Sequence, residues 1–517
     1  MKYILVLLAL AGMLAGGCRK KSPPAAQPSA PPPEVIARLH FVGKEIIEAN
    51  TNAATFKTIW DLPETIVFRD LAFEKWITNV VAMQAMVRTN ATETNLWPLV
   101  KPLVSDLFQV EWYGEWEERT NQPPAWTLAA RLNADQAKVW QTNLTQLTSD
   151  WQWKQPLAFR QERDWMLVGS SPVMLSTNQP IVKEIASRGR PLAETTNYWF
   201  RFEGNLAKVR SWFPFLPGKN LPHAEFNLVG RGDSLRTEAL LRFPTPRRLK
   251  FEPWEFPTNT IREPLISFTA LQGFSDWLSE QPLIKSIEFN TVPNQICLWG
   301  EGRIPLQAYV AAPMPGVTNF LERITTNLVP QWNTNFLAPN RIGEIRAMTN
   351  HQEMVWLRLP IMVPFLRPAF DTNREFLFAG IFPLPPGTNP PPPSELFKQL
   401  NRTNLVYYDW EITQHRMVQV RLIAQLASLV LNKPTVGTNA PPMAWLDAIE
   451  SRLGESVTEI TASSAQDFKL VRKSFVGLNG IELYALARWV ASTNFPAFDW
   501  ARVFQIEPRA TNAPPKL

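Results

Sequence analysis

The chain has 517 residues and a formal net charge of +6; 45% of its residues are hydrophobic and 19% are charged. This balance excludes general disorder, which requires fewer apolar and more charged residues, and the counts of 22 Gly and 2 Cys exclude collagen-like and disulfide-rich scaffolds. We therefore expect a globular protein large enough for two or three hydrophobic cores.

The first 17 residues have the layout of a secretory signal peptide. Residues 3–14 form a 12-residue apolar run, which is shorter than the roughly 20 residues of a membrane-spanning helix and fits the apolar region of a signal peptide. The small residues Ala15, Gly16 and Gly17 then precede Cys18. Small residues of this kind mark the cleavage region of a signal peptide.

The segment that ends at Cys18 resembles the lipobox of bacterial lipoproteins. Lipoboxes usually carry Leu three residues before the Cys, whereas this chain has Ala15 there and Leu14 one residue earlier. The resemblance implies that Cys18 receives a diacylglyceryl thioether and an amide-linked acyl chain, so that membrane lipid is its partner. Two or more acyl chains anchor a protein stably. The alternative is an ordinary signal peptide cleaved nearby, with Cys18 incidental.

Residues 18–34 are expected to form a tether between the lipid and the folded body. Three basic residues, 19–21, suit the level of anionic headgroups, and six prolines follow within residues 22–33. Proline-rich segments extend by about 3.1 Å per residue, which gives the tether a reach of roughly 50 Å. The expected location is therefore the bacterial cell envelope, with the body in the periplasm.

The first domain, residues 35–245, is predicted to be α+β. Apolar residues at helical spacing predict a helix over 68–87, and a second helix is expected over 96–108. Beyond these, strand-like and helical patterns alternate. Strands are expected at 35–42, 109–116, 126–132, 157–160, 165–169, 198–202, 223–229 and 235–243, and helices at 133–147 and 206–212.

The second domain, residues 262–507, repeats this order of elements. Its expected strands lie at 296–302, 305–312, 342–347, 354–359, 405–410, within 457–475 and at 480–489, and its helices at 317–328 and 411–431. We therefore predict an internal duplication, with two similar halves that each pack helices against one face of an antiparallel sheet. Chance matching of short patterns is the alternative. Residues 246–261 are the predicted linker, 383–393 a proline-rich insertion and 508–517 a frayed tail.

No motif for catalysis, metal binding or a cofactor is present. None of the four histidines, His40, His223, His351 and His415, lies within ligand spacing of another, and the phosphate-loop, dinucleotide and nucleophile-elbow patterns are absent. Cys297 lies in an apolar, strand-like segment and is expected to be buried and inert. We predict no catalytic, metal or cofactor-binding residue; an envelope hydrolase whose site is assembled from distant loops is the alternative.

Clustered aromatic residues are the candidates for ligand contact among the 21 Trp and 7 Tyr. Trp112, Tyr113 and Trp116 form one cluster, and Trp151 and Trp153 would share a face of one strand. Exposed rings of this kind stack on sugars or apolar peptide, which would suit a Trp-rich glycan-binding protein. The favoured interpretation is that these rings fill a core.

The sequence therefore predicts a membrane-anchored lipoprotein that binds a partner or organises the envelope without catalysis. A protein or a glycan is compatible with the pattern as partner. Nucleic acid is not expected, because basic residues are dispersed. Uncovered sheet faces or a cleft between the halves would be the ligand sites. Residues 231–233 read Arg-Gly-Asp but are predicted to form a hairpin turn.

Overall fold

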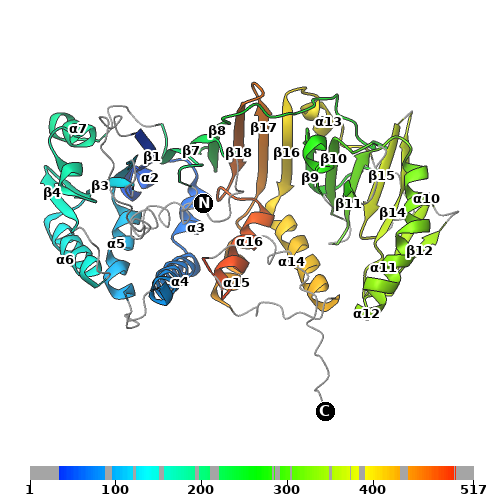
Figure 1. Ribbon diagram of the computed structural model, residues 1–517, viewed down its shortest axis with the longest axis horizontal. Helices are drawn as coiled ribbons and strands as arrows, with labels where there is room; N and C mark the ends of the chain where they lie inside the picture. The colour runs from blue at the N-terminus through cyan, green and yellow to red at the C-terminus, as the bar shows by residue number, and fades with distance from the viewer. Residues whose placement is uncertain are drawn as a thin grey trace, which may run out of the picture.

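One open antiparallel sheet of 18 strands runs through the computed structural model (Figure 1). The structure describes residues 34–87, 96–119, 124–150, 156–191, 197–209, 220–281, 284–285, 291–302, 306–348, 352–372, 374–382, 391–430, 440–493 and 495–496. The strands are β1 (Glu34–Phe41), β2 (Trp112–Glu118), β3 (Ala125–Arg131), β4 (Ala158–Glu162), β5 (Trp165–Gly169), β6 (Phe200–Asn205), β7 (His223–Arg231), β8 (Ser234–Arg242), β9 (Leu265–Gln272), β10 (Gln295–Glu301), β11 (Ala308–Pro313), β12 (Glu344–Met348), β13 (Glu353–Leu357), β14 (Phe365–Asp371), β15 (Arg374–Gly380), β16 (Leu405–Ile412), β17 (Glu455–Ala462) and β18 (Asp467–Ser474).

Helices connect many of these strands, so the predicted α+β class is confirmed. They are α2 (Lys44–Ala49), α3 (Ala54–Trp60), α4 (Pro63–Val87), α5 (Trp97–Gln109), α6 (Ala134–Asp150), α7 (Pro180–Arg188), α8 (Ser275–Ser279), α10 (Val317–Asn327), α11 (Val329–Trp332), α12 (Ala338–Asn340), α13 (Ser394–Leu400), α14 (Thr413–Val430), α15 (Pro441–Glu450) and α16 (Gly480–Ala491). Short 3-10 and π segments, η2 (Pro172–Leu175) and η4 (Asn333–Leu337), complete the set.

The strands fall into an N-terminal half, β1–β8, and a C-terminal half, β9–β18. Across the sheet the N-terminal half runs in the order β4-β5-β3-β2-β1-β6-β7-β8. The C-terminal half runs β14-β15-β11-β10-β9-β16-β17-β18, with β13 and then β12 added beyond β14. The last strands of the two halves, β8 and β18, pair with each other, and this pairing makes the sheet continuous.

Most of the longer helices pack on one face of the sheet, which we call the helical face. In the N-terminal half, apolar residues of α4, α5 and α6 contact strand residues such as Leu39, Trp112 and Phe202 in the largest hydrophobic core. Helices α15 and α16 of the C-terminal half add Trp445 and Leu483 to the same core. The opposite face is covered by α7 at one end and by α13 with residues 254–256 at the other.

The two halves also meet through their helices. The rings of Phe68 on α4 and Trp445 on α15 are stacked, with centroids 4.2 Å apart. The Lys75 ammonium on α4 donates to the carbonyls of Val490 and Ser492, at 2.6 and 2.8 Å. These carbonyls lie at the end of α16, where a positive charge complements the helix dipole. The main hydrophobic core thus crosses the boundary between the halves.

The prediction of a strand at residues 480–489 was wrong, because this segment forms α16. Asn479 caps the helix: its side chain accepts from the Glu482 N–H, and the Glu482 carboxylate accepts from the Asn479 N–H. This reciprocal pair is a capping box. The buried residues Leu483, Ala487 and Val490 then follow at helical spacing. The sequence contained both signals, but the match to the last hairpin of the first domain was given more weight.

The hairpin predicted at 342–347 and 354–359 exists as β12–β13, but it forms the edge of the sheet. A second hairpin, β14–β15, which the prediction omitted, lies between it and β11. By strand order, β14–β15 corresponds to β4–β5 of the N-terminal half. The helix predicted at 206–212 falls on turn residues up to 208, and residues 210–219 lie outside the described part of the chain. The proposed domain limits and linker stay predictions.

Candidate functional site

A narrow apolar pocket lies on the helical face where the two halves meet. It is partly open to solvent. The N-terminal half supplies residues of α3, α4, β7 and β8, and the C-terminal half supplies Trp445 of α15, the loop at 476–478 and the start of α16. Prominent apolar lining residues are Phe56, Trp60, Leu228, Leu235, Leu483 and Leu486.

Among the described residues, two side chains with hydroxyl groups line this pocket, and they differ in their hydrogen bonding. Thr65 is satisfied, since its hydroxyl donates to the Ile59 carbonyl at 2.7 Å and accepts from the Trp445 indole N–H at 3.1 Å. Thr237 is 2% exposed, and its hydroxyl has no hydrogen-bond partner among the described residues. A buried hydroxyl without a partner carries a desolvation cost of about 1–3 kcal/mol. It is the one unsatisfied polar group in the described lining.

The loop between β18 and α16 forms one wall of the pocket. Gly477 in this loop has φ +80°, a left-handed conformation that glycine adopts without strain. Its N–H donates to the Ser474 hydroxyl at 2.8 Å, and its carbonyl accepts from Arg472 at 3.1 Å. The wall is therefore held by hydrogen bonds from the neighbouring strand.

Thr237 begins a row of polar residues that crosses five strands of the helical face. In register across the sheet, Thr237 on β8 lies opposite Arg472 on β18, which lies opposite Thr458 on β17. The row continues to Asp409 on β16 and Thr269 on β9. The Thr269 hydroxyl donates to Asp409 at 2.6 Å. Except for Thr269, which is partly exposed, each of these residues is buried, so the row is a polar layer inside the protein.

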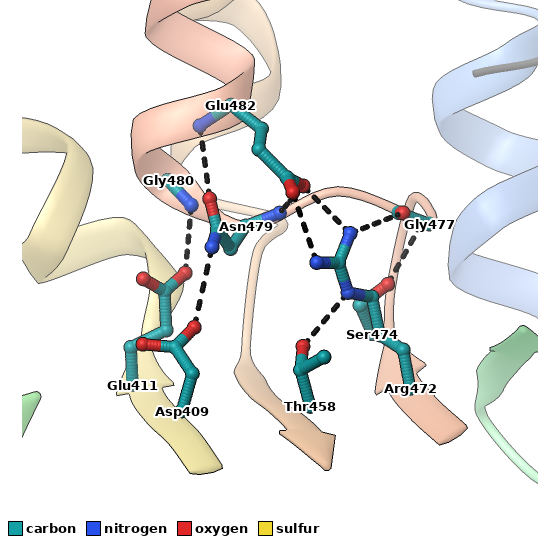
Figure 2. A network of polar contacts seen from close by, with 9 residues as sticks. All are labelled: Asp409, Glu411, Thr458, Arg472, Ser474, Gly477, Asn479, Gly480 and Glu482. Atoms are coloured by element: carbon teal, nitrogen blue, oxygen red, sulfur yellow. Dashed lines mark hydrogen bonds and ion pairs between the residues drawn. The ribbon is translucent and has the colours of Figure 1, made fainter. Parts of the chain in front are cut away.

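Arg472 is the central charge of this layer, as Figure 2 shows. Its guanidinium donates to both carboxylate oxygens of Glu482, at 2.6 and 2.9 Å, and to the Thr458 hydroxyl at 2.8 Å. Burial alone would lower the pKa of Arg472, but the negative charge of Glu482 raises it overall. A bidentate pair of this kind fixes geometry as well as charge. It attaches the first turn of α16 to β18.

Two carboxylates of β16 hold the N-terminus of α16 from the other side. Asp409 accepts from the Asn479 amide at 3.2 Å, and Glu411 accepts from the Gly480 N–H at 2.7 Å (Figure 2). A side chain at Gly480 would lie 3.0–3.1 Å from backbone atoms of Thr413 and Met417, so the close approach of α14 to α16 requires glycine here. Negative charge at a helix N-terminus is favourable.

Glu411 is 0% exposed, and burial, with the nearby charge of Asp409, raises its pKa to about 7. A carboxyl with such a pKa can exchange a proton near neutral pH. General acid–base catalysis, however, requires contact with a substrate, and no part of the Glu411 side chain reaches the surface in this conformation. We therefore interpret the network as the support of the pocket wall.

A second polar cluster lies on the opposite face of the N-terminal half. The His40 ring contacts the Tyr198 hydroxyl at 3.0 Å and the Glu111 carboxylate at 3.2 Å. Nearby, Glu115 accepts from Arg38 at 2.9 Å and from the Tyr113 hydroxyl at 3.0 Å. These groups satisfy one another, and they line neither the pocket between the halves nor the one around Phe41 and Phe108.

The aromatic residues selected from the sequence are placed as follows. Trp112 and Trp116 lie in the main core, and Tyr113 lies in the core beneath α7; all three are buried. Burial, together with the charge of Glu115, raises the pKa of Tyr113. Trp151 and Trp153 lie outside the described residues, as does the lipidation candidate Cys18 with Ala15–Gly17.

Other sequence-based expectations concern reactive groups and the membrane. Cys297 is buried, which raises the pKa of its thiol to about 12, and residues 231–233 form the predicted turn between β7 and β8. Across the described ranges, no three His, Cys, Asp or Glu side chains are grouped so as to hold a metal ion. No helix in those ranges is long and apolar enough to cross a membrane.

Sequence reasoning missed the pocket and the residues of the polar layer. A usable signal existed, because Asp409 and Glu411, Ser456 and Thr458, and Arg472 and Ser474 each stand two residues apart in strands. Spacing by two places both side chains on one face of a strand. In comparisons with known proteins, no family model, no curated protein and no solved structure matches this chain.

Proposed function

We propose that this chain is a lipid-anchored protein of the bacterial cell envelope that binds an apolar ligand without catalysing a reaction. Membrane lipid is the proposed partner of Cys18, and the body lies in the periplasm. The order of charge, apolar run, small residues and cysteine in residues 1–18 supports the anchor. The observation that carries the binding function is the apolar pocket between the two halves.

The pocket supports binding because it combines apolar walls with a rigid frame. Indole and leucine side chains line it, and the Arg472–Glu482 pair fixes the loop that closes one side. Ligand sites in proteins are typically concave, mostly apolar and supplied with few polar groups. The carboxylate of the polar layer, Asp409, is buried and hydrogen-bonded to Thr269 and Asn479, so the surroundings favour binding over hydrolysis.

A thermal melting experiment with n-hexane tests this function. Hexane should raise the melting temperature of the wild type, because a ligand that binds the folded state stabilises it. Leu483→Trp should fill the pocket and abolish the shift, whereas Leu240→Trp, at an exposed position on β8, should retain it. Leu486→Trp provides a second blocked variant should the first fold poorly. An equal shift in all variants would contradict the proposal.

The anchor has its own test in fractionated bacterial cells. Cys18→Ala should move the protein from the membrane fraction to the soluble fraction, because the acyl chains attach to this thiol. Retention of the variant in the membrane fraction would exclude acylation at Cys18 as the anchor. A matched variant, Cys297→Ala, changes the buried thiol and should stay with the membrane.

We also propose that the two halves arose by internal duplication. The support is the order of strands: β9, β10, β11, β14, β15, β16, β17 and β18 take the places of β1 to β8 in order. The β12–β13 hairpin is then an insertion at the edge. Profiles built separately from homologues of each half should align along this correspondence, and profiles without such an alignment would refute duplication.

A further inference from the structure

We infer that the pocket selects apolar ligands carrying one uncharged hydrogen-bonding group, such as an alcohol or an ester, and that Thr237 binds that group. This inference rests on the proposed function, since it assigns a ligand class to the same pocket. It also names the side chain that gives the pocket its specificity.

The first step of the argument is the contrast between Thr237 and its surroundings. The Thr237 hydroxyl is 2% exposed and has no hydrogen-bond partner among the described residues, although the residue lines the pocket. The other lining hydroxyl, on Thr65, and the Trp445 N–H are already paired with each other. A ligand oxygen placed beside Thr237 would therefore satisfy a group that the protein leaves unpaired, and each such buried bond is favourable.

The second step concerns the charge of the ligand. Arg472 lies opposite Thr237 in the sheet, but its guanidinium is already engaged by Glu482, Thr458 and the Gly477 carbonyl. The carboxylate of Asp409 lies further along the same row. A carboxylate ligand would lose its hydration and meet these negative groups without a free cation, which is costly. An uncharged oxygen avoids both costs.

Three six-carbon probes separate these contributions: n-hexane, 1-hexanol and hexanoate. Their dissociation constants are measured by calorimetry on the wild-type protein at one pH and salt concentration. We expect 1-hexanol to bind about three- to tenfold more tightly than hexane, as one net hydrogen bond provides. Hexanoate should bind more weakly than either.

Two variants assign the preference to Thr237. Thr237→Val keeps the shape of the side chain and removes the hydroxyl, so it should bind 1-hexanol and hexane with nearly equal affinity. Thr127→Val removes a buried hydroxyl on β3, away from the pocket, and should keep the wild-type ratio. Melting curves of both variants verify that they are folded.

The outcomes distinguish the inference from the function on which it rests. Three results would overturn the inference: equal binding of hexane and 1-hexanol by the wild type, a preference for 1-hexanol that survives in Thr237→Val, or tightest binding of hexanoate. In each case, binding of hexane would still support the function. If the folded wild type binds none of the probes, both are contradicted.

Discussion

The two halves of the sheet pair their strands in the same order, but their central strands place opposite kinds of side chain against the helices. On the helical face of the N-terminal half, Leu39 on β1 lies beside Phe202 on β6. The corresponding pair in the C-terminal half is Ser267 on β9 beside Glu411 on β16. Both pairs are buried, so one half has an apolar layer where the other has a polar one.

The opposite face shows the reverse arrangement. In the N-terminal half it carries Arg38, whose side chain is 44% exposed, and the buried His40. In the C-terminal half it carries Phe268, Trp299 and Tyr408, which form a core with α13 and the segment before β9. Because side chains alternate along a strand, a shift of the apolar pattern by one residue exchanges the two faces.

This difference teaches that strand order does not decide which face of a sheet becomes the core. The residues at alternate positions of the strands decide it. The pocket lies where the two arrangements meet, next to Leu235 and Thr237 of β8. There the apolar layer of one half ends and the polar row of the other begins, which explains why the pocket has a single unpaired hydroxyl at its edge.

The largest expected effect comes from removing the charge at the centre of the polar layer. Arg472→Met should lower the free energy of unfolding by about 3–5 kcal/mol, because it removes the positive charge that compensates the buried Asp409 and the partly exposed Glu482. Urea denaturation measures this change. Arg242→Met, at an exposed position in the neighbouring strand, should leave the midpoint unchanged. A small effect of Arg472→Met would mean that the layer is hydrated rather than dry.

On the apolar side of the comparison, Leu39→Ala should cost about 2–5 kcal/mol, since it opens a cavity between β1 and the helices. The same denaturation experiment measures it. Leu240→Ala serves as the matched control, because this leucine is 51% exposed. Equal midpoints for both variants would show that the helical face of the N-terminal half is not a packed core.

The pH dependence of stability should come from the polar half. The folded state raises the pKa of Glu411 from 4.5 to about 7, mainly through burial and then through Asp409. Its contribution to stability is therefore complete below about pH 4.5 and is lost as the pH rises through 7, by roughly 3 kcal/mol in total.

Glu411→Gln should remove this dependence and should be more stable than the wild type at pH 8. The glutamine oxygen can still accept from the Gly480 N–H. Unfolding free energies at pH 5 and pH 8 measure the effect. The stability of the wild type could instead fall as the pH drops from 8 to 5, with the same pH dependence in Glu411→Gln. That result would show that another group dominates.

The smallest effect is expected where the two layers meet. Thr237→Val should raise the free energy of unfolding by up to about 1 kcal/mol, since it replaces an unpaired buried hydroxyl with a methyl group. Thr458→Val, whose hydroxyl accepts from Arg472, should lower it instead. Changes of opposite sign in the free energy of unfolding would place the boundary between the apolar and polar layers at Thr237. Equal losses of stability would show that both threonines belong to the polar layer.

Most strands of the fold could be predicted because short-range alternation of apolar and polar residues specifies them. The hairpins β4–β5 and β7–β8 and the helix α10 were located in this way. The helix α16 and the hairpin β14–β15 were not, since the capping box at Asn479 competed with an apparent repeat and Phe365 to Gly380 has no clear alternation. The pairing of β8 with β18 joins residues more than 200 positions apart, which no local pattern reveals.

The candidate site was beyond sequence reasoning for the same reason. Thr237 and Arg472 belong to different halves, and only the joining of the sheet places them opposite each other. Trp112 and Trp116 were expected to fill the core and lie in it, whereas Trp445, which lines the pocket, stood in a segment for which no element was predicted. Residue type did not distinguish rings of the core from rings of a pocket; only the fold located the pocket.

The most direct test of the central claim is a crystal structure of the protein under xenon pressure. Xenon occupies apolar cavities, and its position is visible from its electron density. The account predicts a xenon atom among Leu235, Trp445 and Leu483, and its loss in Leu483→Trp crystals. Xenon bound elsewhere in the protein, with none in this pocket, would contradict the proposal that the junction of the two halves binds an apolar ligand.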